Sequence, residues 1–216
     1  DFQPNSDSDY INLITNKLGT KHHTIYLDTP ELADSLKEAM IARDLPGMAD
    51  VDSSLLLFCK AVKKEATVSI MGECADEIFG GYPWFFREDA LSSGTFPWSI
   101  NISGRQHLLN PELQEKINLK EYIDYRYNES LSKVELLNVD SKETKEKRKI
   151  TYLTMNWFMQ TLLSRTDRMG MYNGFELRVP FCDYRLAEYV WNIPWEIKAL
   201  HGREKGLLRY IMKDEL

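Results

Sequence analysis

The chain has 216 residues with a net charge of −6, and 43% of its residues are hydrophobic. These values are typical of a globular domain with a buried core; they exclude a fibrous or disordered chain and argue against nucleic-acid binding. No apolar run reaches the roughly 18 residues that a membrane span requires, and the first residues lack the pattern of a signal peptide.

Cysteine usage points to a reducing compartment. The three cysteines stand at positions 59, 74 and 182, an odd number without CxxC spacing. A disulfide framework or a zinc site is therefore not expected, no metal ligand is assigned, and the location we expect is cytoplasmic. Cys74 and Cys182 are interpreted as small packing residues rather than nucleophiles.

The first part of the chain alternates predicted helices and short strands. Apolar residues at helical spacing and a terminating Gly19 predict the first helix, and β-branched runs predict the strands. This order is typical of an α/β fold with a parallel sheet. The predicted elements are helices at 7–18, from Thr29 onward and from Asp52 or Ser53 to Val62, with strands at His23–Leu27 and Thr67–Met71.

The second part of the chain is predicted to be mainly helical. Residues 82–118 contain three prolines and two glycines and are expected to be irregular. Helices are then predicted at 119–137, 141–163, 184–192 and 203–214. The chain should therefore consist of an α/β sheet part at 1–90 and a mainly helical part at 91–216.

An acidic, glycine-rich loop follows the second predicted strand. The strand ends at Met71, and Gly72 is followed by three carboxylates and a Gly-Gly pair, in the sequence MGECADEIFGGY. Ligands of open parallel sheets lie beyond the carboxyl ends of strands, so the loop could bind an ammonium group or phosphate-bound Mg²⁺, or transfer protons. Acidic residues are equally common at a helix N-terminus, where the macrodipole favours them. The residues alone do not decide between these readings.

Two motifs then give a resemblance to a known family. Met71–Tyr82 resembles the Ser-Gly-Glu-Gly-Ala-Asp-Glu-Leu-Phe-Gly-Gly-Tyr motif of asparagine synthetases. The block Leu163–Arg209 resembles the same family, which has Arg-x-Asp, Glu-x-Arg-x-Pro-Phe-Leu-Asp and Lys-x-x-Leu-Arg there. The stretch Leu18–His23 looks like the passage before the family's third strand. The resemblance departs at Met71, where the family has Ser, and at Cys74 and Cys182, where it has Gly and Leu.

The resemblance implies a fold and a reaction. Residues 1–216 would be part of a synthetase domain with a truncated, Rossmann-like sheet of the ATP-pyrophosphatase (adenine nucleotide alpha-hydrolase-like) group and a large helical C-terminal part. The enzymes of this family use ATP and Mg²⁺ to adenylate the side-chain carboxylate of aspartate. Ammonia, made from glutamine by an N-terminal glutaminase domain of the same polypeptide, then displaces AMP. The resemblance also allows a homodimer.

Site residues follow from the motif match. Met71 and Gly72 would lie against ATP, Glu73 would be catalytic in adenylate formation, and Asp76 would hold the substrate's α-ammonium group. The remaining assignments are Glu77 and Arg165 as residues lining the substrate site, Lys198 and Lys205 as phosphate contacts, and Arg178 with Asp183 as a buried structural ion pair.

Some parts of the family's machinery do not occur in this sequence. The phosphate loop Ser-Gly-Gly-x-Asp-Ser is expected before residue 1 and a phosphate-facing Arg-x-Lys segment after residue 216, so the chain alone is predicted to be inactive. Two alternatives stay open: an enzyme resembling β-lactam synthetases that adenylates another carboxylate, and a degenerate, non-catalytic binding module.

Overall fold

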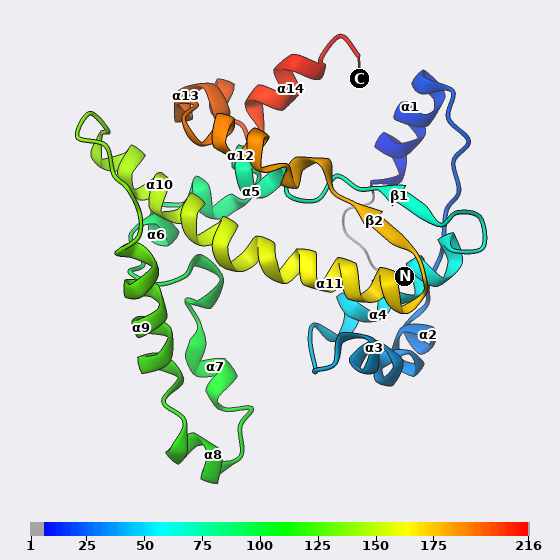
Figure 1. Ribbon diagram of the computed structural model, residues 1–216, viewed down its shortest axis with the longest axis horizontal. Coiled ribbons are helices and arrows are strands. Elements are labelled where there is room, and N and C mark those ends of the chain that lie inside the picture. Colours follow the sequence, from blue (N-terminus) through cyan, green and yellow to red (C-terminus); the bar gives the residue numbers. More distant parts are fainter. Residues whose placement is uncertain (1–6, 216) are drawn as a thin grey trace. The chain divides into compact units, whose positions relative to one another are not determined.

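The computed structural model describes residues 7–215, which are mostly helical with a small sheet (Figure 1). The chain forms two compact units, and each is described by itself. The first unit contains the chain up to Ser69, Arg165–Leu177 and the chain from Arg209; the second contains Ile70–Ser164 and Arg178–Leu208. The predicted division at residue 90 concerns the type of secondary structure rather than contacts, and it stays a prediction.

The first unit begins with four helices: α1 (Ser8–Leu18), α2 (Thr29–Asp34), α3 (Leu36–Arg43) and α4 (Ala49–Val62). The helix predicted at 7–18 is confirmed, and Gly19 ends it with a φ of 63°. The helix predicted from Thr29 is divided in two by Ser35. The third helix was predicted to begin at Asp52 or Ser53, but it begins at Ala49. Asp52 therefore lies inside the helix, where its side chain accepts a hydrogen bond from the Met48 N–H at 3.0 Å and stabilises the first turn.

Apolar side chains from three helices and the end of a turn form the core of this unit. Leu56 and Cys59 of α4 are fully buried, and the fully buried Met169 and Phe175 pack in the same cluster. Leu55, Leu56, Cys59 and Val62 recur at the spacing of one helix face, which explains why this segment is helical and why that face is inside. The remaining buried members are Ala39 and Ala42 of α3.

The strand predicted at His23–Leu27 is wrong. Residues 20–28 have no regular secondary structure, and most of their side chains are exposed. A β-strand is stabilised by a hydrogen-bonded neighbour, and no strand of the described residues pairs with this segment. Local β propensity alone therefore did not produce a strand here.

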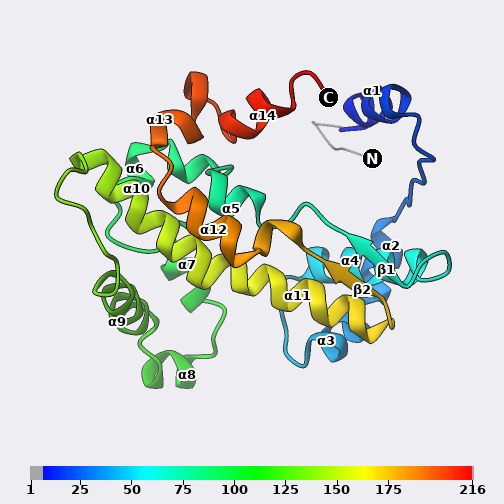
Figure 2. The same cartoon turned by 45° about the horizontal axis from the view of Figure 1, so that its top comes forward.

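The sheet consists of β1 (Val68–Ile70) and β2 (Glu176–Arg178), which lie side by side in Figures 1 and 2. Glu176 N donates to Thr67 O at 2.9 Å, and Met71 N donates to Arg178 O at 2.8 Å. The paired residues increase together along both strands, so the pairing is parallel. The strand predicted at Thr67–Met71, in a parallel sheet, is confirmed.

The second unit contains many short helices where irregular structure was predicted. Residues 82–118 form single 3₁₀ turns at Pro83–Phe85 and Pro97–Ser99 and the helices α6 (Glu88–Leu91), α7 (Ile102–Gln106) and α8 (Pro111–Lys116). The prediction missed them because each is only one or two turns long, too short for a periodic apolar stripe. Their starts are nevertheless encoded: the Asn101 and Asn110 side chains cap α7 and α8.

Longer helices follow, as predicted, although their ends differ. The helix predicted at 141–163 begins at the Ser141 cap, passes through a π-helical turn and continues to Tyr172. Among the described residues, no helix combines the length and apolar character needed to cross a membrane. The elements are α9 (Leu119–Leu131), α10 (Lys142–Leu153), the π turn (Thr154–Phe158), α11 (Met159–Tyr172), α12 (Tyr184–Trp191), α13 (Trp195–Lys198) and α14 (Gly206–Met212).

Two apolar clusters hold the second unit together. In one, Ile78 and Phe79 pack with Val190 of α12, and the Phe79 ring meets Phe181 edge-on at 6.1 Å. In the other, Phe85 is fully buried against Trp195, with ring centroids 5.1 Å apart. Ile78 and Phe79 belong to the acidic segment itself, and Gly80 lies against the Trp195 ring, so both clusters pack against that segment.

Candidate functional site

The acidic loop leaves the carboxyl end of β1, as predicted. The chain passes from Ile70 through Met71 and Gly72 and enters a short helix, α5 (Ala75–Phe79). Gly72 is exposed, and a methyl group placed on it would meet no atom within 4 Å. A ligand can therefore approach the Gly72 backbone, while the half-buried Met71 is fixed by its hydrogen bond to Arg178 O.

Cys74 turns the chain into α5 in the left-handed conformation. Its φ is 73° and its ψ is −7°, a region that favours glycine, because a Cβ there crowds the backbone. This explains why glycine suits the position in the motif of the resembled family. The thiol is buried, and burial raises its pKa above the ordinary value. The neighbouring Cys182 raises the pKa of Cys74 further. The burial of Cys74 supports its interpretation as a packing residue.

Asp76 presents its carboxylate to an ammonium group. Lys205 Nζ lies 2.7 Å from Asp76 Oδ1, and the two side chains are 32% and 34% exposed. The backbone of Lys205 has a φ of 50°, a strained value for a residue with a Cβ. The structure therefore shows Asp76 binding a primary ammonium group at a half-open position. The predicted phosphate contact of Lys205 stays a prediction.

Glu77 lies beneath the loop rather than on its surface. Its side chain is 1% exposed, and the Tyr82 hydroxyl donates to Glu77 Oε1 at 2.5 Å. Burial raises the pKa of Glu77, and the Tyr82 hydrogen bond opposes that shift. Burial also raises the pKa of Tyr82, as does its hydrogen bond to Glu77. The charges of Asp76 and Glu73 also raise the pKa of Glu77, so the three carboxylates are close enough to interact, and the predicted contact of Glu77 with substrate stays a prediction.

Glycine is needed at the two positions of the Gly-Gly pair for different reasons. Gly80 has a φ of 73°, and a Cβ on it would lie 2.6 Å from the Trp195 ring. At Gly81 a Cβ would lie 1.7 Å from Asp76 Oδ1. Gly80 thus allows the loop to pack on Trp195, and Gly81 leaves room for the Asp76 carboxylate.

The other predicted site residues lie in different settings. Glu73 is half-buried in the turn between β1 and α5, while Arg165 is half-buried on α11. Arg165 belongs to the first unit and the loop to the second, so their common site stays a prediction. Lys198 is only 2% exposed, and its predicted phosphate contact stays a prediction.

The expected buried ion pair between Arg178 and Asp183 is wrong. Arg178 is exposed, and the Asp183 side chain is 33% exposed. Asp183 instead caps α12 and pairs with Arg185, whose Nη2 lies 2.6 Å from Asp183 Oδ2. That contact lowers the pKa of Asp183 to about 2. The sequence did not reveal the pair of Asp183 and Arg185, because side chains two residues apart do not face each other within a helix. Asp183 stands at the N-cap, outside the helix, and from there its side chain reaches Arg185.

The loop does not offer a ready metal site. Within residues 7–215, no three His, Cys, Asp or Glu side chains are grouped so that they could hold an ion. Asp76 already pairs with Lys205, and Glu77 accepts from Tyr82. The described side chains therefore do not form a complete Mg²⁺ site by themselves, and Mg²⁺ held by the phosphates of ATP stays a prediction.

Comparison with known proteins decides the family. The family model described as asparagine synthase matches residues 1–216, the whole chain. This chain belongs to the asparagine synthase family. Family members most similar to it include "Asparagine synthetase [glutamine-hydrolyzing] 3" of Bacillus subtilis, which is 52% identical over 96% of the chain. "Asparagine synthetase [glutamine-hydrolyzing] 1" of the same organism is 27% identical over 89% of the chain, and that of Mesocricetus auratus is 24% identical over 93%.

The chain covers about a third of these asparagine synthetases: 34% of the first, 35% of the second and 27% of the third. Membership of the asparagine synthase family is thus established along the chain.

Proposed function

We propose that this chain is part of the synthetase domain of a glutamine-hydrolysing asparagine synthetase and that its acidic loop builds the aspartyl-adenylate site. In this proposal β1 and β2 belong to a larger Rossmann-like sheet, and ATP and Mg²⁺ enter above the carboxyl end of β1. A glutaminase domain of the same polypeptide supplies ammonia. The names of the relatives and the family match along the whole chain support this assignment.

The observation that carries the proposal is the contact between Asp76 and Lys205. A carboxylate in the first turn of α5, the helix that follows β1, already pairs with a primary ammonium group at 2.7 Å. The α-ammonium of aspartate has the same chemistry, and a carboxylate has two oxygens with about four acceptor positions. Asp76 can therefore hold the substrate's ammonium group beside Lys205 and orient the side-chain carboxylate toward the Gly72 backbone.

The chemical task is to convert a poor electrophile into a good one. The side-chain carboxylate of aspartate attacks the α-phosphorus of ATP, pyrophosphate leaves, and ammonia then attacks the acyl carbon and releases AMP. Gly72 provides close approach for the nucleotide, Asp76 fixes the amino acid, and Glu73 stands between them in the turn. Positioning of this kind accounts for a large part of the rate of two-substrate reactions.

Pyrophosphate exchange into ATP tests the adenylation step by itself. In the full-length protein, Glu73→Gln should abolish aspartate-dependent exchange and leave glutaminase activity unchanged, because Glu73 belongs only to the proposed adenylation site. Glu88→Gln, an exposed residue of α6, is the matched control and should exchange normally. Normal pyrophosphate exchange by Glu73→Gln would refute the role of Glu73 in adenylation. Exchange that requires a carboxylic acid other than aspartate would point to a different substrate.

A further inference from the structure

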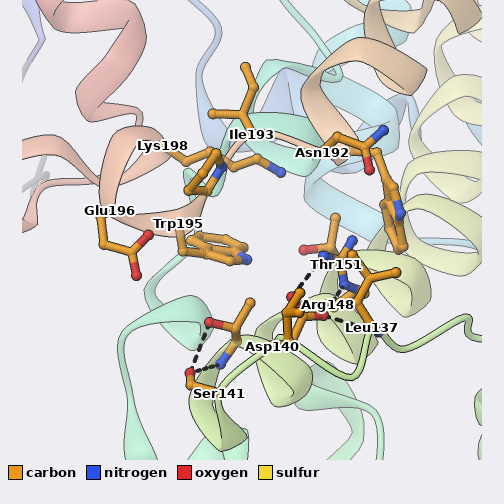
Figure 3. Close-up of a pocket in the computed structure, with 14 residues that line it drawn as sticks. Leu137, Asp140, Ser141, Arg148, Thr151, Asn192, Ile193, Trp195, Glu196 and Lys198 are labelled. Atoms are coloured by element: carbon orange, nitrogen blue, oxygen red, sulfur yellow. Dashed lines mark hydrogen bonds and ion pairs between the residues drawn. The ribbon is translucent and has the colours of Figure 1, made fainter.

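A cavity of about 330 Å³ lies within the second unit, between α10 and the segment from α12 to α13 (Figure 3). Arg148 and Thr151 of α10 and Asp140 just before it form one side, and Trp195 and Lys198 form the other. The lining combines these charged and polar side chains with apolar ones. The apolar residues are Leu137, Val139, Trp191, Ile193 and Pro194. The site does not depend on the function proposed above.

Lys198 brings a buried cation to this cavity. The residue is 2% exposed, and its ammonium has no hydrogen bond or ion pair with any residue that the structure describes. Its Nζ lies 5.3 Å from the centre of the Trp195 ring. Burial, and then the charge of Arg148, lower the pKa of Lys198 to about 8. An unpaired buried cation is costly, and an anion in the cavity would relieve that cost.

The charged groups around Lys198 leave an excess of one positive charge. Asp140 accepts hydrogen bonds from Arg148 Nε at 2.9 Å and Nη2 at 3.3 Å, so this pair is neutral. Glu196 also lines the cavity, but it is exposed, so water and salt screen its carboxylate. Lys147 lies over the Trp195 ring, 5.3 Å from its centre, but its Nζ pairs with Glu143 Oε1 at 2.7 Å and adds no net charge.

We infer that this cavity binds a small monocarboxylate with an apolar body, its carboxylate held by Lys198 and the remaining guanidinium nitrogen of Arg148. A single negative charge balances the single excess cation, whereas a phosphate dianion exceeds it. The apolar body would pack on the indoles of Trp191 and Trp195. Arginine together with lysine is a suitable pair for a carboxylate, because both donate charge-assisted hydrogen bonds.

Calorimetric titration of the full-length protein tests the site with butyrate, benzoate and inorganic phosphate as probes. We expect the two monocarboxylates to bind and phosphate to bind at least tenfold more weakly. Lys198→Met, which keeps the apolar stem, should weaken monocarboxylate binding about tenfold or more. The control Lys142→Met changes an exposed lysine of α10 outside the cavity and should leave binding unchanged.

The pH profile gives a second readout that does not depend on a variant. Because Lys198 loses its proton near pH 8, monocarboxylate affinity should fall as the pH rises from 7 to 9. Equal binding by Lys198→Met and Lys142→Met, phosphate binding as tight as that of the monocarboxylates, a flat pH profile, or no binding of either monocarboxylate would each overturn the inference.

Discussion

Replacing Gly81 by alanine should disturb substrate binding through Asp76 rather than through the backbone. A Cβ on Gly81 would lie 1.7 Å from Asp76 Oδ1 and 2.8 Å from Asp76 Cβ. Gly81 is not among the residues with positive φ, so alanine itself fits the local backbone. The Gly81 N–H also donates to Asp76 O at 2.8 Å, which keeps the two residues together. Asp76 must therefore rotate or the loop must shift.

The size of the effect follows from the contacts that are lost. The ion pair of Asp76 with Lys205 is about one-third exposed, so its loss costs at most about 1 kcal/mol of stability. Overpacking against Asp76 adds about 1–3 kcal/mol. A hydrogen bond to a charged group contributes about 1.5–3 kcal/mol, so losing the one to the substrate's ammonium should lower kcat/KM for aspartate by about 10- to 150-fold.

The assay is aspartate-dependent pyrophosphate exchange with the full-length protein, together with urea unfolding. Gly104→Ala in α7 is the matched control, because the nearest atom to its added Cβ is 3.6 Å away, an ordinary contact. In an Asp76→Ala background, Gly81→Ala should add almost nothing to the loss of kcat/KM, since both changes remove the same interaction, while the 2.8 Å contact with the Cβ at position 76 still lowers stability. An unchanged kcat/KM for aspartate, or fully additive losses of kcat/KM, would refute the reasoning.

Three further predictions concern the same loop and the chain as a whole. Cys74→Gly should be more stable than Cys74→Ala by about 1 kcal/mol in urea unfolding, because only glycine relieves the left-handed strain; the reverse order would contradict this. Because burial raises the pKa of Glu77, its favourable contribution is full below about pH 4.5 and is lost as the pH rises through the raised pKa. Glu77→Gln should therefore gain stability relative to the natural protein as the pH rises above about 4.5, and parallel pH curves would speak against it. The 216-residue chain alone should form no asparagine from aspartate, ATP and ammonia, because its sequence contains no Ser-Gly-Gly-x-Asp-Ser loop; product at about a hundredth of the full-length rate would disprove this.

The sequence predicted helices well where caps and apolar spacing agree. Asp28 and Ser141 cap α2 and α10 as their residue types suggest, and Gly19 ends α1. The strand at His23–Leu27 failed because strand formation depends on a partner elsewhere in the chain. β2 was missed for the related reason that three residues, Glu176–Arg178, give too short a pattern.

The site was only partly predictable, since burial separates neighbours that look alike in sequence. Asp76 and Glu77 are adjacent acids, but successive residues on a helix point about 100° apart, so one faces Lys205 and the other the interior. Nothing local reveals that Tyr82 donates to Glu77. The burial of Lys198 likewise depends on α10 packing across from α13, which the short sequence around it does not contain.

The π turn at Thr154–Phe158 has a consequence for how this family tolerates insertions and deletions. Such a turn is one residue longer than the α-helical turn it replaces, and each residue advances a helix by about 100° and 1.5 Å. Deleting one residue there would restore an α-helical turn that still closes one full rotation, so Thr166 and Met169 of α11 would keep their buried orientation, whereas a deletion between Met159 and Thr166 would turn that face by about 100°. The π turn thus absorbs one residue without changing the orientation of the helix that follows, and a relative that lacks one of its five positions would need no compensating change before Thr166.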